Sequence, residues 1–396
     1  MTDSQHTQKG RESADIVILG AGPAGLVLGN LLLRSGIDCV VLERTGRDHV
    51  LNRARAGFLA AHTVRVLRRH GLDEGLKRRG REHGVCEFRT EDGTFRLDYR
   101  QLGNGDPHTV YPQNELVADL LAAYLDAGGR IRFDTEAVEV GDADGDGPWV
   151  TAREPDGRTV RWHARYVAAC DGRHGAGRGS LPDRAVRHHR DHGVSWLGLL
   201  AEAPPSLDAV GYATHPRGFA GHMARSADIT RYYLQCERGT PAEHLSDEQI
   251  WDELDLRMRS TDHGPLRRGP ILQRAVVDLE SDVLDTLRYG SLFLAGDAAG
   301  LISPSAAKGA NLAVLEAELL AGAFADDIHG GDPEPLARYS DRCLTHIWRA
   351  QEFSHWMIGL LHGAPPFQER MRRARMESLR TSRTHQDWFA EQYVGI

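Results

Sequence analysis

Short apolar runs alternate with helical patterns at both ends of the chain, whereas the middle is rich in strands. Near the start, an apolar run at 15–19 leads into a glycine-rich turn, a helical pattern at 26–34 and a second apolar run at 38–42. Near the end, a run at 292–295 precedes a small-residue loop and a helical pattern from about 308 to 320. Both patterns are typical of strands that lead through a short turn into a helix.

The stretch 196–235 has a different pattern. It holds three runs of strand type, W-L-G-L-L-A, A-V-G-Y-A-T-H and R-Y-Y-L-Q-C. These runs predict a second domain built on a mostly antiparallel sheet, closed by a helix near 247–259. Between the two regions the pattern predicts helices at 60–70 and 114–127, a hairpin at 86–97, and strands at 130–140, 149–153 and 165–170.

These elements divide the chain into four parts. We expect a flexible tail at 1–13, the first part of a nucleotide-binding domain at 14–185 with a small hairpin insertion near 81–104, and a sheet domain at 186–290. The segment 291–396 then returns to the first domain and ends in helices. The fold class is α/β, and α+β overall, with one domain interrupted by the other.

The first glycine turn has the spacing of a dinucleotide-binding fingerprint. Gly20, Gly22 and Gly25 follow the first strand, and Glu43 ends the second strand 23 residues after Gly20. The first glycine permits the tight turn, the second lets a pyrophosphate approach the backbone, and the third lets helix and strand pack closely. Glu43 is expected to accept hydrogen bonds from ribose hydroxyls.

A second turn, Gly296-Asp297, follows the strand at 292–295 and precedes a helix that begins near Lys308. Such a turn brings a carboxylate and free backbone N–H groups to a ligand, and a helix N-terminus favours negative charge. The strand at 165–170 ends in a similar pair, Asp171-Gly172.

Composition narrows the classes of function. The chain has 396 residues and a net charge of −8, with charges of both signs mixed along it, so no basic stripe suggests a nucleic acid. No apolar run reaches the roughly 18 residues of a membrane span, and 1–13 lacks the apolar core of a signal peptide. The five cysteines are scattered without a C-x-x-C motif, which favours free thiols in the cytoplasm.

Two segments resemble metal sites superficially. The acidic run at 142–147 lacks the following glutamate of a calcium loop, so we expect a hairpin turn there. The histidines at 188, 189 and 192 have no identifiable distant co-ligand, so we expect a connecting loop and no metal.

Seven segments in order resemble the class A FAD-dependent aromatic monooxygenases, and within them the para-hydroxybenzoate hydroxylases. They are R-A-R-A-G at 53–57, V-Y-P-Q-N-E at 110–115, H-P-R-G-F-A at 215–220, R-Y-Y-L-Q at 231–235, A-G-D-A-A at 295–299, K-G-A-N-L-A at 308–313 and Y-V-G at 393–395. The resemblance implies a Rossmann-like FAD-binding domain interrupted by a substrate domain with a mostly antiparallel sheet.

The resemblance also implies the chemistry. One FAD oxidises the substrate, NADPH or NADH supplies the hydride from a surface groove, and O₂ forms a flavin C4a-hydroperoxide that hydroxylates a 4-hydroxybenzoate-like acid ortho to its phenol. The phenol must lose its proton through the protein, and water must be kept out. A homodimer in the cytoplasm, without membrane or nucleic-acid partner, is expected.

The resemblance assigns roles residue by residue. The catalytic set consists of Tyr212, Tyr393, His83 and Pro304, of which the first three form a proton relay. The substrate pocket contains Arg225, Tyr233, Met223 and Gly221. Besides the glycines and Glu43, the cofactor site contains Arg55, Gln113, Asp171, Asp297, Lys308, Asn311 and Arg231. The nicotinamide groove contains Arg44, Arg53, His174 and Arg178.

Several positions depart from the family pattern. Met223 stands where the hydroxylases have a serine that binds the substrate carboxylate, and Gly221 replaces a bulky aliphatic residue on the same strand face. These changes suggest a reshaped pocket and a substituted or variant benzoate. Glu280 stands near an arginine position that helps bind NADPH, which leaves the choice of nicotinamide open.

Two alternatives keep part of this chemistry. One is N-oxidation or oxidative decarboxylation of an aminobenzoate or related acid with the same cofactors. The other is a flavoprotein that binds an aromatic acid without transferring oxygen. The Tyr212–Tyr393–His83 set favours hydroxylation, because a binding protein needs no route for a phenol proton.

Overall fold

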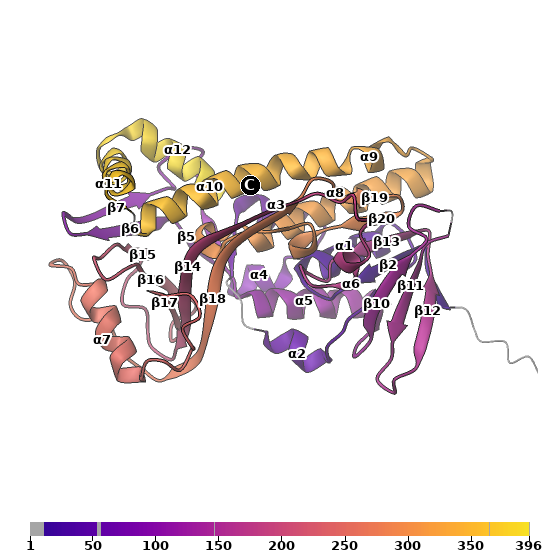
Figure 1. Ribbon diagram of the computed structural model, residues 1–396, viewed down its shortest axis with the longest axis horizontal. Helices are drawn as coiled ribbons and strands as arrows, with labels where there is room; N and C mark the ends of the chain where they lie inside the picture. Colours follow the sequence, from indigo (N-terminus) through magenta and orange to yellow (C-terminus); the bar gives the residue numbers. More distant parts are fainter. Residues whose placement is uncertain (1–11, 54–56, 146, 364, 396) are drawn as a thin grey trace, which may run out of the picture.

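Parallel strands at the start, middle and end of the chain form one central sheet in the computed structural model, which describes residues 12–53, 57–145, 147–363 and 365–395 (Figure 1). The strand order is β19-β20-β13-β2-β3-β9, and all neighbours are parallel except β19 and β20. The bounds are Ile16–Leu19 (β2), Cys39–Leu42 (β3), Arg130–Arg132 (β9), Tyr166–Ala169 (β13), Arg288–Tyr289 (β19) and Leu292–Leu294 (β20). The predicted interrupted domain is therefore confirmed in its topology.

Three helices pack around this sheet: α1 (Pro23–Arg34), α5 (Gln113–Asp126) and α8 (Gly309–Gly330). All four residues of β2 have 0% exposed surface, because helices and further chain cover the sheet. That burial explains why the strand sequence I-V-I-L has no polar alternation. Parallel strands direct their carboxyl ends to the same edge, so the residues that follow β2, β3, β13 and β20 lie side by side.

An eight-stranded sheet forms the second part of the molecule, with the order β21-β18-β14-β17-β16-β15-β6-β7. Its neighbours are antiparallel except β15 and β6. The bounds are Val85–Thr90 (β6), Gly93–Asp98 (β7), Arg187–Ala201 (β14), Val210–Ala213 (β15), Ala220–Ala224 (β16), Thr230–Cys236 (β17), Ile271–Leu284 (β18) and Gly300–Leu301 (β21). The predicted antiparallel sheet is confirmed, but it is larger than 186–290.

The hairpin of β6 and β7 corrects one domain boundary. The sequence assigned it to the nucleotide-binding domain as an insertion near 81–104, whereas β6 pairs with β15 over Cys86–Arg89 and extends the second sheet. The pairing is made with a strand more than a hundred residues away, which local patterns do not reveal.

β14 and β18 are long strands that run from the second sheet toward the nucleotide-binding domain (Figure 1). The histidines at 188, 189 and 192 lie in β14, so the predicted connecting loop is wrong there. His188 pairs with Asp285 and His192 with Ser281. Within the described ranges, no group of three or more possible metal ligands gathers.

Two small sheets and several short helices complete the first part. One sheet has the order β1-β12-β11-β10 and the other β4-β8-β5. The strands are Glu12–Ser13 (β1), Phe58–Leu59 (β4), Arg81–His83 (β5), His108–Val110 (β8), Glu136–Gly141 (β10), Trp149–Arg153 (β11) and Thr159–His163 (β12). The helices are Arg47–Asn52 (α2), Ala61–Arg69 (α3), Glu74–Arg79 (α4) and Ala176–Gly179 (α6).

These small sheets test two of the predictions made from the sequence. The antiparallel pairing of β10 with β11 confirms the hairpin turn at 142–147, within the described positions. The predicted tail 1–13 is wrong for its last two residues, because β1 pairs with β12. Its first eleven residues lie outside the described ones.

The C-terminal helices join the two parts of the molecule. They are Glu334–Ala337 (α9), Tyr339–Leu361 (α10), Pro366–Thr381 (α11) and Arg383–Val394 (α12), after the short turns Gly296–Ala298 (η1) and Pro304–Ala306 (η2). The helix α10 runs along one side of the molecule and α11 and α12 lie near the hairpin β6–β7 (Figure 1). The remaining helix, α7 (Asp247–Arg257), covers the outer face of the second sheet.

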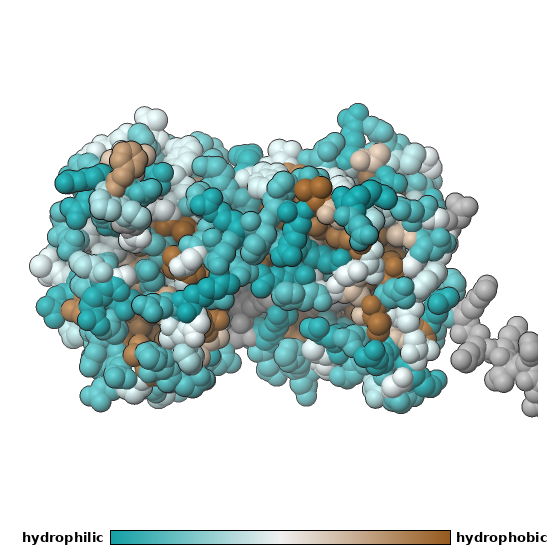
Figure 2. Space-filling view, in the orientation of Figure 1, coloured by the Kyte–Doolittle hydropathy of each residue, from teal (hydrophilic) through white to brown (hydrophobic). Residues whose placement is uncertain are grey.

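The face of the molecule shown in Figure 2 is mostly hydrophilic, with scattered small hydrophobic patches. Among the described helices, none combines the length and the apolar character needed to cross a bilayer.

Candidate active site

The glycine turn after β2 forms a cradle for a phosphate group. Gly20 has φ +92°, and a Cβ there would lie 2.6 Å from the Cys170 carbonyl oxygen. A Cβ at Gly25 would lie 2.0 Å from the Gly20 carbonyl oxygen, whereas one at Gly22 would meet nothing within 4 Å. Gly20 and Gly25 therefore require glycine for close packing. Gly22 leaves open space before the N-terminus of α1, as a dinucleotide pyrophosphate needs.

Glu43 shapes the edge of this cradle. Its Oε2 accepts a hydrogen bond from the Ala21 N–H at 2.7 Å, and its Oε1 accepts from the Thr45 N–H at 2.8 Å and hydroxyl at 2.7 Å. The carboxylate thus ties the glycine turn to the end of β3. Carboxylate oxygens accept several bonds, so Glu43 retains capacity for ribose hydroxyls.

Asp171, at the end of β13, has an unpaired oxygen beside the same edge. Its Oδ2 accepts from the Gly177 N–H at 3.0 Å, while its buried Oδ1 has no hydrogen-bond partner among the described residues. Burial raises the pKa of this carboxyl to about 6, although backbone N–H groups and Arg44 oppose the rise. A buried oxygen without a partner is costly and is the kind of group that a bound ligand satisfies. These residues fit FAD.

The Gly296-Asp297 turn rests on a residue that the sequence reasoning missed. Gly296 has φ +65°, and its N–H donates to Glu316 Oε2 at 2.6 Å. Glu316 lies on α8 and is 2% exposed. Burial, reinforced by the nearby Asp297 charge, raises the pKa of Glu316 to about 8. An acidic residue inside the apolar helix pattern A-V-L-E-A was the available signal.

Lys308 precedes α8 and binds the end of the chain. Its ammonium donates to the carbonyl oxygens of Gln392 at 2.6 Å and Tyr393 at 3.0 Å, and also to that of Gly395. Burial lowers the pKa of Lys308 to about 7, with a smaller contribution from Arg349. The described contacts therefore give Lys308 the task of holding α12 against the start of α8.

Asn311 is also engaged within the protein. Its Oδ1 accepts from the Ala60 N–H and the Thr63 hydroxyl, and its amide donates to the carbonyl oxygens of Phe58 and Ala307. These bonds use both donors and both acceptor positions of the amide. Asn311 thus fixes the strand β4 beside α8, and its predicted flavin contact stays a prediction.

The predicted nicotinamide residues do not share one environment. Arg44, Arg53 and His174 are exposed, whereas the Arg178 side chain is only 8% exposed and pairs with Asp282 at 2.8 Å. Arg178 also donates to the Ala298 carbonyl oxygen at 2.6 Å, so it braces the turn at 296–298.

Three further positions complete the picture of this region. Glu280 is held by Arg173 and by Arg238 at 2.9 Å, which neutralises the carboxylate that departs from the family pattern. Gln113 is half-buried at the start of α5. Arg55 lies outside the described residues.

The predicted substrate residues share one face of the second sheet. Strand register sets Tyr212 opposite Gly221, Gly221 opposite Tyr233, and Met223 opposite Arg231. Directly opposed residues point to the same face, so alternation confirms that Gly221 and Met223 lie together. This face belongs to the apolar cluster that includes Phe88, Trp196 and Tyr393, whereas the other face packs on α7.

The space beside Gly221 is partly filled. A Cβ at this position would lie 2.9 Å from Phe219 Cζ and 3.3 Å from a Tyr233 ring carbon. The ring of Phe219 also stacks on Trp196 with centroids 4.9 Å apart. Gly221 therefore admits the Phe219 ring, which occupies part of the space that a bulkier residue would fill.

Two arginines on this face create a buried positive region. Arg225 is 8% exposed, and Arg231 Nε is buried without a hydrogen-bond partner among the described residues. Burial, reinforced by the charge of Arg231, lowers the pKa of Arg225 to about 10. Arg225 still carries its charge at neutral pH. Two neighbouring guanidinium groups in an apolar surrounding favour an anion between them.

The tyrosine pair of the predicted relay is formed. The hydroxyls of Tyr212 and Tyr393 are 2.7 Å apart, and the two residues are 9% and 2% exposed. His83 does not continue this pair directly, because its Nδ1 bonds to the Tyr99 hydroxyl at 2.8 Å. Tyr99 was not identified from the sequence, where it is one aromatic residue in a hairpin. Pro304 is exposed at the start of η2, in the loop before α8.

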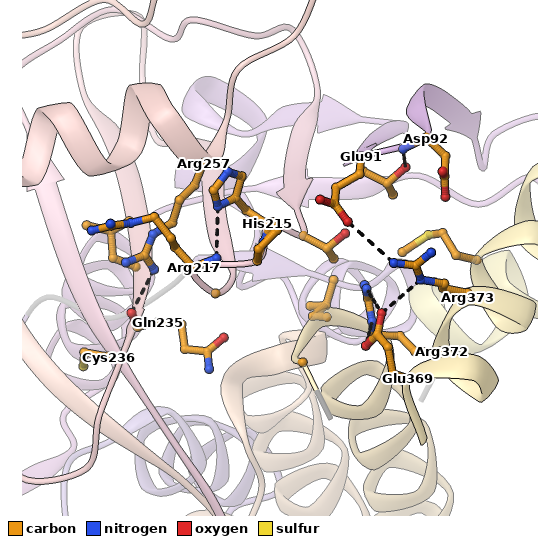
Figure 3. Close-up of a pocket in the computed structure, with 18 of the residues that line it drawn as sticks. Glu91, Asp92, His215, Arg217, Gln235, Cys236, Arg257, Glu369, Arg372 and Arg373 are labelled. Atoms are coloured by element: carbon orange, nitrogen blue, oxygen red, sulfur yellow. Dashed lines mark hydrogen bonds and ion pairs between the residues drawn. The ribbon is translucent and has the colours of Figure 1, made fainter. Parts of the chain in front are cut away.

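A cavity of about 1230 Å³ lies elsewhere, between the second sheet and α11. It contains none of the predicted site residues. Some of its charged groups pair with one another, as Arg373 does with Glu91 at 3.6 Å and with Glu369 at 3.3 Å (Figure 3).

Fold and cradle together define a flavoprotein of the dinucleotide-binding class. A family model described as "FAD binding domain" matches residues 13–354. The p-hydroxybenzoate hydroxylase of Acinetobacter baylyi is 36% identical over 96% of this chain and 95% of that protein. A 3-amino-4-hydroxybenzoate 2-monooxygenase of Streptomyces platensis is 30% identical over 84% of each chain. The chain belongs to this FAD-binding family and is an FAD-dependent aromatic monooxygenase.

A solved structure agrees in fold. The p-nitrophenol 4-monooxygenase of Pseudomonas putida superposes with a TM-score of 0.82 at 19% identity, covering 97% of this chain and 99% of the other. At this level of identity the agreement shows the fold alone. It leaves the substrate to be argued from the pocket.

Proposed function

We propose that the protein hydroxylates a para-hydroxylated benzoate, with or without a further ring substituent, at the carbon ortho to its phenol. When bound, FAD supplies the redox chemistry that activates O₂, with NADPH or NADH as the source of hydride. The observation that carries the proposal is the buried Tyr212–Tyr393 hydrogen bond on the same sheet face as Arg225 and Arg231.

The two ends of this face suit the two ends of a 4-hydroxybenzoate. Arg225 and Arg231 favour a carboxylate, which guanidinium groups bind through paired N–H donors. The Tyr212 hydroxyl suits the phenol, because it bonds to a second hydroxyl that can exchange a proton with it. Names of the two relatives, p-hydroxybenzoate hydroxylase and 3-amino-4-hydroxybenzoate 2-monooxygenase, agree with an acid that carries a phenol in the para position.

The protein residues have three tasks in this reaction. Arg225 and Arg231 orient the ring by its carboxylate, Tyr212 accepts the phenol proton as it passes its own to Tyr393, and the apolar cluster keeps water away. Loss of the phenol proton makes the ring electron-rich at the ortho carbon. Met223, opposite Arg231, makes one side of the carboxylate region apolar.

Turnover with a panel of benzoic acids tests the proposal. NAD(P)H consumption, peroxide release and product mass are measured for 4-hydroxybenzoate, 3-amino-4-hydroxybenzoate, 4-aminobenzoate and benzoate. We expect a hydroxylated product from the two phenols only. Tyr212→Phe should remove product formation while the protein retains FAD, whereas Tyr124→Phe, which removes a buried hydroxyl 0% exposed in the first domain, should leave both unchanged.

Three results would contradict the proposal. Release of all consumed oxygen as peroxide with every phenol would favour a binding protein. A nitrogen-oxidised or decarboxylated product would favour the corresponding alternative. The role given to Tyr212 is wrong if Tyr212→Phe loses FAD to the same extent as it loses product formation. It is also wrong if this variant forms product as fast as the wild type. A homodimer remains a prediction, which sedimentation tests.

A further inference from the structure

Five polar aromatic residues form one cluster, which includes the Tyr212–Tyr393 pair. The ring of Tyr99 meets that of Tyr393 edge-on, with centroids 5.4 Å apart at 69°, and the Tyr99 hydroxyl bonds to His83 Nδ1 at 2.8 Å. The fifth member is His108, on β8. The cluster extends from the 2%-exposed Tyr393 to the half-buried His83. It therefore connects the interior of the substrate face with solvent.

His108 lies beside both hydrogen-bonded pairs, Tyr212–Tyr393 and Tyr99–His83. Its ring is edge-on to Tyr393 at 5.0 Å and to Tyr99 at 5.6 Å, and it packs on Phe58 at 4.4 Å between centroids. His108 is 1% exposed, and its Nδ1 has no hydrogen-bond partner among the described residues. A buried nitrogen without a partner costs about 1–3 kcal/mol, so its retention in this position requires a reason. Its position beside both tyrosines supplies one.

We propose that Tyr99 and His108 belong to the route by which the substrate phenol loses its proton, which then runs from Tyr212 and Tyr393 past His108 to Tyr99 and leaves at His83. The inference rests on the proposed function, since it needs a phenol at Tyr212. Nothing in the resemblance assigned these two residues.

The proton balance of this route is simple. The phenol O–H bond breaks and Tyr212 gains that proton while passing its own to Tyr393. Tyr393 passes a proton to His108 Nδ1, which becomes an imidazolium until the same nitrogen passes that proton to Tyr99. Tyr393 and Tyr99 each gain one proton and lose one. His83 receives a proton at Nδ1 and releases one from Nε2 to water. The protein is unchanged in charge, and the net result is one phenolate and one hydrated proton.

The electrostatics of the cluster agree with a relay of neutral groups. Burial lowers the pKa of His83 to about 4, reinforced by the charges of Arg100 and Arg96 and opposed by Asp208. Burial also raises the pKa of Tyr99 and lowers that of His108. At neutral pH the three groups are therefore uncharged before and after the transfer.

A stopped-flow experiment on the FAD-bound protein tests the route. Wild type and variants are mixed with 4-hydroxybenzoate and jumped from pH 6 to pH 8, and the absorbance of the bound phenolate is followed. General acid–base groups contribute at least about a hundredfold to a rate, so we expect Tyr99→Phe to slow phenolate formation by more than about tenfold. The matched control is Tyr124→Phe, which loses a buried hydroxyl that donates to Arg130 far from the site.

The outcomes separate the inference from the function. Slowing below about tenfold in Tyr99→Phe overturns the inference, because a relay member contributes more than that. If Tyr99→Phe loses FAD, the same threshold applies to His108→Phe, which keeps a buried aromatic ring and lacks Nδ1. If wild type fails to bind 4-hydroxybenzoate and every other phenol, the proposed function fails and the inference with it. Binding without phenolate formation overturns the inference and leaves the class of enzyme intact.

Discussion

Replacing Arg225 by glutamine should weaken binding of a benzoate but not of its amide. The guanidinium of Arg225 is 8% exposed and lies in an apolar surrounding with Arg231 nearby. Glutamine keeps a polar side chain of moderate length but carries no charge. The change therefore removes the attraction for a carboxylate while it disturbs packing little.

The size of the effect follows from the burial. Hydrogen bonds to charged groups contribute about 1.5–3 kcal/mol, and more where water is excluded. At about 1.4 kcal/mol for each factor of ten, Kd for 4-hydroxybenzoate should rise about 10- to 150-fold. Arg231 keeps one positive charge near the site, so we expect the lower half of this range. Since the pKa of Arg225 is about 10, the effect should be constant between pH 6 and pH 9.

Flavin absorbance or fluorescence titration gives Kd for 4-hydroxybenzoate and for 4-hydroxybenzamide. Arg257→Gln is the matched control, because the Arg257 side chain is 9% exposed but pairs with Glu253 on α7, away from the site. The benzoate-specific loss should appear only in Arg225→Gln. Equal weakening of acid and amide, or no weakening of either, would refute the assignment of Arg225 to a carboxylate.

Three other changes test separate parts of the site. Glu43→Ala removes the acceptor of the Ala21 N–H and should weaken FAD retention by about tenfold or more in a dialysis assay. FAD retention equal to that of the wild type would contradict the role given to Glu43 in FAD binding. Met223→Ser should improve binding of plain 4-hydroxybenzoate, and an unchanged Kd would mean that Met223 does not face the ring. In the folded protein Glu316, with its pKa near 8 against an ordinary 4.5, binds a proton that the unfolded chain has lost, so the free energy of unfolding should fall from about pH 4.5 to pH 8. Glu316→Gln should flatten that part of the profile, and an unaltered slope in denaturant titrations would contradict the raised pKa.

The cofactor end of the site could be predicted because local chain rules determine it. Gly20 and Gly25 make backbone contacts too close for any side chain, and Gly296 has a positive φ that favours glycine. Glu43 and Asp171 follow strands whose apolar patterns are plain in the sequence. Parallel strands then bring these residues to one edge without any further information.

The substrate end could be predicted only in part. Alternation along the strand gave the shared face of Gly221 and Met223, because side chains in a strand follow a period of two. It did not give Tyr99 or the membership of its hairpin in the second sheet. Those depend on the pairing of β6 with β15 and on α12, which come from distant parts of the chain.

The same distance effect explains why Lys308 was assigned to the flavin and is found on the C-terminal backbone. A lysine before a helix has no local pattern that distinguishes a ligand contact from an internal one. Here its ammonium bonds to the Tyr393 carbonyl oxygen, while the Tyr393 hydroxyl bonds to Tyr212. The start of α8 is therefore linked to the Tyr212 hydroxyl through Lys308 and Tyr393. If the proposed function holds, these two bonds connect the helix that follows the Gly296-Asp297 turn with the proposed proton route.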